Sequence, residues 1–540
     1  MAVILINSYT VASCFLVVAV ITLVAKLSQT NRPKGTRDFP GPIGLPWIGR
    51  VHDVPIRHQW FKFKEWADVY GSIYQTKMLG KNHVWISSEK IATELLSKRG
   101  LIYSDRPAIP NIDGSKTRGE YLPLLGYNDA WKRQRKYGHH IMAQGYEANY
   151  HDYPMIEAKF LLYRLLHEPT KYSFFLDQFT GRVISRLAWG RPEPAADLKK
   201  NAFALLHGIS PAGPPSNVFP ALMLLPEFLA PWKKEERVRH KWEEGFYCGL
   251  QNDVKLAMAE KRARPSWTRT YFEQKEFFGF DEHEAAYAVG MMALAGVQTV
   301  GSPLNTFILA MVLHPEWQAK MRNEIDEVCG DRMPTMSDQP NMPILRAILK
   351  EVLRWRPPVP TGIPHESQKD DVWEGHFIPK GSYIHPVEWA MSRDVEMYPQ
   401  PDSFNPDRWL NPKYPTYKEP LSQYPTILGH TQFGFGRRVC QGQDIVNTEM
   451  THACGGIIWA FTLGRSYDAH GKMIPIPAYD YSTLLITRPL QFSFDLKPRS
   501  DERMKQIIRN WEEADGLDTQ GQPSYDPSFR GEFEGKNVYY

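Results

Sequence analysis

Two apolar segments of different character stand out in the pattern of hydrophobic and polar positions. The first, residues 2–25, carries no charged side chain, and it is long enough to cross about 30 Å of hydrocarbon as a helix. Basic residues follow it rather than precede it, which argues against a cleaved signal peptide and places the rest of the chain in the cytosol. We therefore predict a single-pass membrane anchor at residues 1–27, followed by these basic residues: Lys26, Arg32, Lys34 and Arg37.

The second apolar segment predicts a long buried helix. It opens with Asp281 and Glu284, which have the spacing of a capping box, and small and apolar residues continue to Leu313. A helix of that length spans roughly 50 Å, enough to cross a domain. Pro303 lies inside it and has no N–H for the carbonyl of Thr299, so we predict a distortion of the helix at that turn.

Shorter patterns complete a mainly α prediction with a small β-subdomain. Alternating residues at 83–87 predict a strand, and a helix should follow near residues 89–98. Asn128 can cap one further helix, and Pro343 can start another that ends at Pro357. The polar tail predicts a short helix near residues 502–513 within a flexible end. The predicted divisions are 1–27 anchor, 28–50 proline-rich linker, 51–498 catalytic domain and 499–540 C-terminal extension.

Composition excludes several classes of protein. A net charge of +4 over 540 residues is too small to argue for a nucleic-acid partner. The five cysteines are odd in number and widely spaced, which argues against a disulfide framework and favours a reducing compartment. No pattern of closely spaced cysteines and histidines suggests a zinc site.

One glycine-rich stretch, residues 433–442, carries the most specific chemistry. Its glycines allow a tight turn in which backbone N–H groups point at the sulfur of Cys440. Arg437 and Arg438 should favour the thiolate. A thiolate is a strong axial ligand for haem iron, and it favours O–O cleavage. The alternative is a buried cysteine in an ordinary loop.

The stretch fits F-x-x-G-x-R-x-C-x-G, and the chain resembles the cytochrome P450 family from about residue 39 to 498. The resemblance implies the cytochrome P450 fold and a haem b whose iron is ligated by Cys440. Gln441 and Val446 depart from the commonest family residues, proline and alanine, without removing the ligand. The resemblance assigns cofactor contacts to Phe433, Gly434, Arg438 and Cys440.

Two more segments resemble haem-contacting motifs of the family. Trp131 and Arg135 lie four residues apart on one helical face, and they match the W-x-x-x-R motif that holds a haem propionate. His365 stands where many members place a propionate donor. The alternatives are a basic surface helix and an ordinary strand-end histidine. The resemblance also implies a buried structural triad that supports the haem loop: Glu351, Arg354 and Arg408.

The centre of the long helix reads Ala295-Gly296-Val297-Gln298-Thr299 and resembles the oxygen-activating signature [AG]-G-x-[DE]-T. By resemblance, Gly296 lets the backbone approach the haem, and Thr299 offers a hydroxyl to bound dioxygen and water. Gln298 replaces the usual acid, and an amide can only orient a water rather than relay a proton. The resemblance therefore gives catalytic roles to Ala295, Gly296, Gln298 and Thr299.

The resemblance implies a monooxygenase of the endoplasmic reticulum membrane that acts on a lipophilic small molecule. Its style is similar to filamentous-fungal members that make secondary metabolites. Electrons would come from a separate NADPH–cytochrome P450 reductase, because no dinucleotide motif is present. A haem-thiolate isomerase or dehydratase that needs neither O₂ nor reductase is the alternative, and a haem sensor is a third class. The expected pocket walls are residues 209–232, 358–364 and 481–485, and the expected docking cations are Lys132, Arg133, Lys136 and Arg437.

Overall fold

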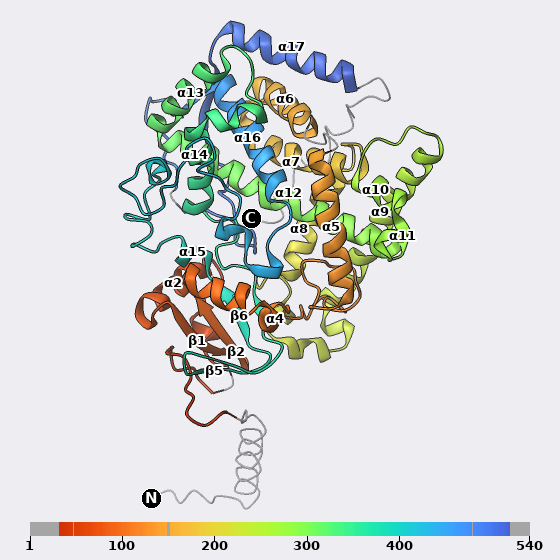
Figure 1. The fold of residues 1–540 in the computed structure, drawn as a ribbon, viewed down its shortest axis with the longest axis vertical. Coiled ribbons are helices and arrows are strands. Elements are labelled where there is room, and N and C mark those ends of the chain that lie inside the picture. Colours follow the sequence, from red (N-terminus) through yellow and green to blue (C-terminus); the bar gives the residue numbers. More distant parts are fainter. Residues whose placement is uncertain (1–31, 47, 148–151, 478, 519–540) are drawn as a thin grey trace, which may run out of the picture.

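A computed structural model describes residues 32–46, 48–147, 152–477 and 479–518, and the predicted anchor at residues 1–27 lies outside them. The described chain is mainly helical, and its helices surround the long central helix α12 (Glu282–Leu313) (Figure 1). Within the described chain, only α12 is long and apolar enough to cross a membrane, but 83% of its apolar window is buried. It is therefore a core helix of the domain.

The structure confirms the predicted strand at residues 83–87, and it confirms the predicted helices after residue 88, after Asn128 and from Pro343. The helix after residue 88 continues as a π-helical turn, Thr93–Lys98. The α-helices are α2 (Gln59–Tyr70), α3 (Glu89–Ala92), α4 (Gly100–Tyr103), α5 (Asp129–Glu147), α6 (Asp152–His167), α7 (Tyr172–Trp189), α8 (Ala195–Ile209), α9 (Pro231–Ala259), α10 (Trp267–Glu273), α11 (Lys275–Phe278), α12, α13 (Pro315–Cys329), α14 (Pro343–Trp355), α15 (Glu388–Met391), α16 (Gln443–Ala460) and α17 (Asp501–Asp518).

The strands form small sheets at one end of the molecule and along its edge. The four-stranded sheet has the order β1-β2-β6-β3, in which β2 pairs parallel with β6 and the other pairs are antiparallel. Two antiparallel pairs, β4 with β5 and β7 with β8, lie apart from it. The strands are β1 (Ile73–Met78), β2 (Lys81–Ile86), β3 (His365–Glu366), β4 (Asp371–Trp373), β5 (His376–Ile378), β6 (Tyr383–Pro386), β7 (Phe461–Arg465) and β8 (Phe494–Pro498).

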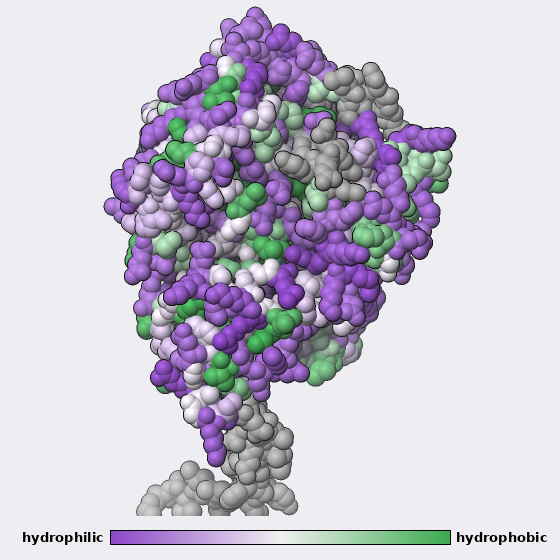
Figure 2. All heavy atoms as spheres, viewed as in Figure 1, coloured by the Kyte–Doolittle hydropathy of each residue, from purple (hydrophilic) through white to green (hydrophobic). Residues whose placement is uncertain are grey.

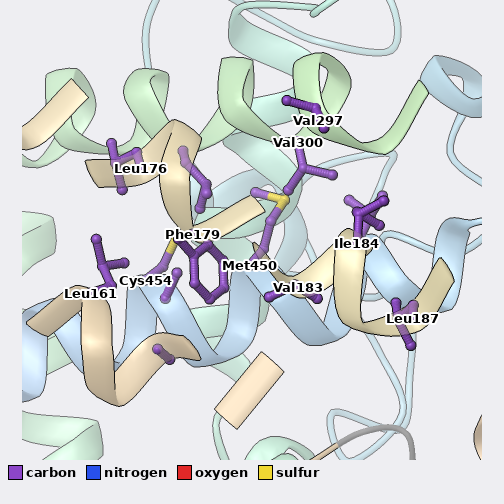
Figure 3. Close-up of a cluster of buried hydrophobic side chains, with 14 of the residues drawn as sticks. Leu161, Leu176, Phe179, Val183, Ile184, Leu187, Val297, Val300, Met450 and Cys454 are labelled. Carbon is purple, nitrogen blue, oxygen red and sulfur yellow. The ribbon is translucent and has the colours of Figure 1, made fainter. Parts of the chain in front are cut away.

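The main hydrophobic core lies where α7, α12 and α16 meet (Figure 3). Phe179 and Val183 of α7 reach toward Met450 of α16, while Val297 and Val300 descend from α12. All of these side chains are almost fully buried. The core thereby fixes α12 above α16, the helix that follows the cysteine loop.

Two chain segments predicted as separate pieces pack onto the domain. In the described part of the predicted linker, Pro40 accepts a hydrogen bond from the N–H of Gln75 in β1, and Arg50 donates its N–H to Lys77. The helix predicted near residues 502–513 is confirmed as α17. The prediction that this part of the tail is flexible is wrong, because α17 packs against α6 through Trp511. The sequence prediction did not recognise Trp511 as an apolar anchor, because the segment around it is mostly charged.

Candidate active site

The cysteine loop is held by backbone geometry that requires glycine. The N–H of Cys440 donates to the carbonyl of Phe433 at 2.7 Å. Gly434 and Gly436 have φ angles of 80° and 56°, which other residues rarely adopt. A Cβ at Gly436 would lie 2.2 Å from the Leu96 carbonyl, so the loop can approach the π-helical turn Thr93–Lys98 only with glycine there. The glycine-rich sequence thus fixes the sulfur at the start of α16.

The Cys440 side chain is solvent-accessible yet lies deep among protein atoms, and this burial raises the pKa of its thiol. The Gly442 N–H and the Arg135 charge act in the opposite direction and lower that pKa. The predicted N–H donor is thus confirmed. The expectation that Arg437 and Arg438 favour the thiolate is wrong, because the cation that acts on the sulfur is Arg135. Metal coordination would complete the deprotonation that this environment only assists.

A cluster of buried cations lies beside the sulfur and brings together the predicted haem contacts. Burial and repulsion by neighbouring arginines lower the pKa of Arg438 to about 8. Arg438 lies over the Trp131 ring at 4.5 Å, and Arg135 lies over the same ring at 5.8 Å. Among the described residues, no hydrogen bond or ion pair engages the Arg135 guanidinium. Such a concentration of positive charge calls for an anion.

Arg106 belongs to the same cluster, although no motif in the sequence singles it out. Burial and the Arg135 charge lower its pKa to about 9. It donates to the carbonyls of Ile363 and Pro364, and its Nε is buried without a partner. The nearby Asp105 offsets its charge only in part, and Lys116 also binds that carboxylate at 2.9 Å. Its signal was a lone arginine before a proline, a pattern typical of any loop.

His365 lies in this region as predicted, but its imidazole is neutral. It is 3% exposed, and its Nδ1 is 2.7 Å from the Tyr103 carbonyl. Burial and the charges of Arg106 and Arg438 lower its pKa well below the usual value. With Nδ1 protonated toward Tyr103, Nε2 would be an acceptor unless a bound anion drew a second proton to the ring.

The central helix presents one partly exposed face in an otherwise buried run. Between residues 285 and 312 every residue is buried except five, and these include the predicted Ala295, Gly296 and Thr299. The helix borders an accessible space at that face rather than solid core. The partly exposed residues are Met292, Leu294, Ala295, Gly296 and Thr299.

Two details of this helix bear on the sequence expectations. A Cβ at Gly296 would lie 2.7 Å from Ile184 of α7, so the glycine allows close packing of α7, and its approach to haem stays a prediction. The helix continues without interruption through Pro303, where a distortion likewise stays a prediction. Thr299 donates its hydroxyl to the Ala295 carbonyl at 2.7 Å, and the neighbouring Gln298 is 7% exposed.

The predicted capping box is half formed. The Asp281 carboxylate accepts from the Glu284 N–H at 2.8 Å, as an N-cap should. The Glu284 carboxylate turns instead to Arg133 of α5 at 2.9 Å. The start of the central helix is therefore joined to the helix that carries Trp131 and Arg135.

The predicted triad supports the far side of the cysteine loop. Arg354 donates from two nitrogens to the Glu351 carboxylate at 2.7 and 2.8 Å, and Arg408 approaches the same group at 3.3 Å. All three side chains are fully buried. Arg354 also donates to the carbonyls of Ser392 and Pro401, so the triad ties α14 to the segment that leads into the loop.

The predicted pocket walls meet around the 480s. Thr487 donates its N–H to the Pro358 carbonyl at 2.8 Å, and its carbonyl accepts from Ser302 of α12 at 2.5 Å. The N–H of Leu485 donates to Ser210, at the start of the 209–232 segment. A small cleft is lined by Pro360 and Tyr481 among others. Residues from all three predicted walls are therefore joined.

The fold and the donor set fit one class of protein. A sulfur next to buried cations, beneath a helix with an accessible face of small residues, suits a flat dianionic haem bound through iron. Cys440 would ligand the iron, while Arg106, Arg135, Arg438 and Trp131 would hold the acidic side of the ring. Phe433 and Gly434 shape the loop below it.

Comparisons with known proteins agree with this class. The family model described as Cytochrome P450 matches residues 39–494. The chain is 32% identical to "Cytochrome P450 monooxygenase 58" of Postia placenta over 87% of this chain and 90% of that relative. It is 30% identical to "Cytochrome P450 monooxygenase virE" of Hypocrea virens, over 92% of each chain.

The chain therefore belongs to the cytochrome P450 family, and the two relatives named above are fungal monooxygenases. It is an oxidoreductase of that kind. Members of the family carry haem on a cysteine thiolate and receive electrons from a redox partner.

Proposed function

We propose that this protein is a membrane-bound monooxygenase that inserts one oxygen atom of O₂ into a lipophilic small molecule. The observation that carries the proposal is the only partly neutralised cluster of Arg106, Arg135 and Arg438 beside the Cys440 sulfur. A dianionic haem b ligated by that sulfur satisfies both features. Once bound, the haem supplies an iron that can be reduced and can activate O₂.

The protein's part in oxygen chemistry is to hold protons and water at the turn around Thr299. Its hydroxyl donates to the Ala295 carbonyl, so its lone pairs can accept a hydrogen bond from water in the accessible space. Gln298 can orient that water but cannot exchange a proton as an acid does. We infer that proton delivery runs through ordered water held by Thr299, with Gln298 as a positioning group.

A second function is favoured by one observation. Gln298 replaces the usual acid, and an isomerase or dehydratase that rearranges a peroxide needs no proton relay of that kind. Thr299 favours the monooxygenase because its hydroxyl is the group that would serve such a relay. The two functions differ in whether product formation needs NADPH and O₂.

The surface supports two partners, a bilayer and a reductase. Exposed apolar side chains occur near the described N-terminus and in the segment between α8 and α9, both at the lower end of Figures 1 and 2. We place the endoplasmic reticulum membrane there, with residues 1–27 as anchor and the catalytic domain in the cytosol. The most exposed of these side chains are Ile43, Ile56, Leu224 and Phe228.

NADPH–cytochrome P450 reductase would dock on the cations of α5 and the cysteine loop. Lys132, Lys136 and Arg437 are exposed there, whereas Arg133 is engaged by Glu284. Lys132 also forms an ion pair with Asp129 at 2.9 Å, so the positive face is smaller than the sequence suggested.

We further propose that the substrate is a fungal secondary metabolite, because the relatives named above are fungal.

The decisive experiment is the carbonyl spectrum of the purified protein. Reduced with dithionite and exposed to carbon monoxide, the wild type should show the red-shifted Soret band of a thiolate-ligated haem, and Cys440→Ser should lose it. Cys454→Ser, a buried cysteine of α16, is the matched control and should keep the band. Absence of the band in folded wild-type protein would overturn the proposal.

An assay in membranes that contain the protein can separate the two candidate functions. With reductase present, product from a precursor identified by metabolite profiling should require both NADPH and O₂. Product formed without either would favour the isomerase. Thr299→Ala should raise the peroxide released per NADPH consumed, because the hydroxyl that steadies water is gone.

A further inference from the structure

Gln441 directly follows the proposed iron ligand, and its side chain makes a contact that the commoner proline could not make. Its Nε2 donates to the backbone carbonyl of Arg135 at 2.9 Å. Arg135 belongs to α5, whereas Gln441 belongs to the loop before α16. The amide therefore ties the turn of α5 that carries Arg135 to the loop that carries Cys440.

Gly138 gives this amide its place against α5. A Cβ at Gly138 would lie 2.7 Å from Gln441 Oε1, well inside van der Waals contact, and 3.2 Å from Met292 Sδ. Gly138 is one turn beyond Arg135 and is itself buried. The Nε2 of Gln441 thus donates to α5, and its Oε1 lies where a side chain at position 138 of the same helix would otherwise be.

The position of Arg135 matters because the proposed function places its guanidinium among the cations that hold the haem. Arg135 lies over the Trp131 ring at 5.8 Å, and Arg438, two residues before Cys440, lies over the same ring at 4.5 Å. No described residue pairs with the guanidinium, so its location depends on the backbone of α5 and on Trp131, over which it lies. Reduction of a haem adds negative charge, and a nearby cation stabilises the reduced form.

We propose that Gln441 is a positioning residue that holds the Arg135 turn of α5 against the cysteine loop and thereby raises the reduction potential of the haem. This inference rests on the proposed function and deepens it, because it names the residues by which this chain tunes its haem. Gln441 touches neither the iron nor the substrate. Its effect passes through the position of Arg135 beside the proposed haem site.

The test is a double-mutant cycle read by spectroelectrochemical titration of the purified holoenzyme. Gln441→Ala should shift the midpoint potential to a more negative value, since α5 loses its tie to the loop. Gly138→Ala should shift it in the same direction by displacing the amide. In the Gln441→Ala background, Gly138→Ala should add far less, because the closest atom that its methyl would strike is absent and only the flexible Met292 side chain, at 3.2 Å, remains.

Two further variants keep the proposal open to refutation. Gln441→Glu retains the size of the side chain but loses the donor, and it should also shift the potential negatively even if Gln441→Ala holds haem poorly. Gln491→Leu removes a similar amide-to-carbonyl bond, to Thr170 at 3.0 Å, and should leave the potential unchanged. The thiolate carbonyl band should persist in every variant.

The outcomes distinguish this inference from the proposed function. If all variants keep both the carbonyl band and the wild-type potential, the role of Gln441 is wrong while the monooxygenase stands. If Gly138→Ala shifts the potential equally with and without the Gln441 amide, the two residues are not coupled and the inference also fails. If wild-type protein lacks the band, both proposals fall together.

Discussion

Arg106 is the residue whose role depends most on the structure. Its guanidinium is buried, repelled by Arg135, and satisfied only in part by two carbonyls. A haem propionate would add a charge-assisted hydrogen bond, worth about 1.5–3 kcal/mol. Arg106→Met should therefore weaken haem binding about tenfold to a hundredfold. The measurement is the transfer of haem from the purified protein to an excess of apomyoglobin.

Arg118→Met is the control for this prediction. Arg118 comes from the same loop region but forms an exposed ion pair with Asp113, so its loss should leave haem transfer at the wild-type rate. Equal transfer from Arg106→Met and wild type would mean that the cluster does not hold the propionates.

The sequence selected most of the cluster but not all of it. Cys440, Trp131 and Arg135 carry spacings that constrain their chemistry, and the structure brings them together. Arg106 belongs to no motif with such a spacing. It becomes buried only when its loop folds over β3, and the sequence does not reveal this. The side of the helix that Gly296 faces was likewise invisible, since a glycine in a helix does not show which neighbour needs the room.

At the scale of elements, the long helix was predictable because several features of the sequence indicate the same bounds. Its N-cap, apolar run and final His-Pro all mark the bounds that α12 has. The distortion expected at Pro303 stays a prediction, because a helix can bend at a proline without being interrupted. In the following turn, Asn305 donates its side-chain amide to the Gly301 carbonyl at 2.8 Å.

Glu388 of α15 makes a pH-dependent contact with the segment before the cysteine loop. Its carboxyl accepts from Thr431 Oγ1 and Gln432 Nε2, both at 2.9 Å, and burial raises its pKa from 4.5 to about 8. Because the folded state holds this proton more tightly than the unfolded chain, its contribution to stability is complete below pH 4.5. That contribution is lost as the pH rises through about 8.

Glu388→Gln should therefore flatten the dependence of stability on pH. The amide oxygen can still accept both hydrogen bonds, but no proton is released. In wild type this one group lowers the free energy of unfolding by up to about 1.4 kcal/mol per pH unit across that window. Urea unfolding from about pH 5 to about pH 9 should show a shallower slope in the variant. Glu502→Gln, at an exposed position, should keep the wild-type slope, and an unchanged slope in Glu388→Gln would refute the assignment.

At the scale of the whole molecule, the parts that the sequence divides are joined by contacts it does not reveal. The described linker residues pair with β1, and α17 closes over α6 on the opposite end of the chain. Composition suggested a flexible tail because charged residues outnumber apolar ones there. The few apolar residues recur on one helical face, however, and these are the buried ones: Ile507, Trp511 and Ala514.

Trp511 tests whether this extension belongs to the cooperative fold. Its ring lies 4.7 Å from that of Phe160 on α6, whose other neighbour is Arg182 at 4.6 Å. Arg503, in the first turn of α17, donates to the Asp331 carbonyl at 2.6 Å and lies over Trp459 of α16. Trp511→Ala should therefore lower the free energy of unfolding by about 3–5 kcal/mol.

The matched variants show which physical effect is responsible. Trp511→Phe keeps a ring against Phe160 and should cost less than alanine, while Glu512→Ala, exposed on the next position, should cost little. Since α6 packs directly on α16, the haem-loop helix, loss of the Trp511 contact should also hasten loss of the thiolate carbonyl band on warming. If Trp511→Ala unfolds at the wild-type urea concentration, α17 is only an appendage, and the domain ends at β8.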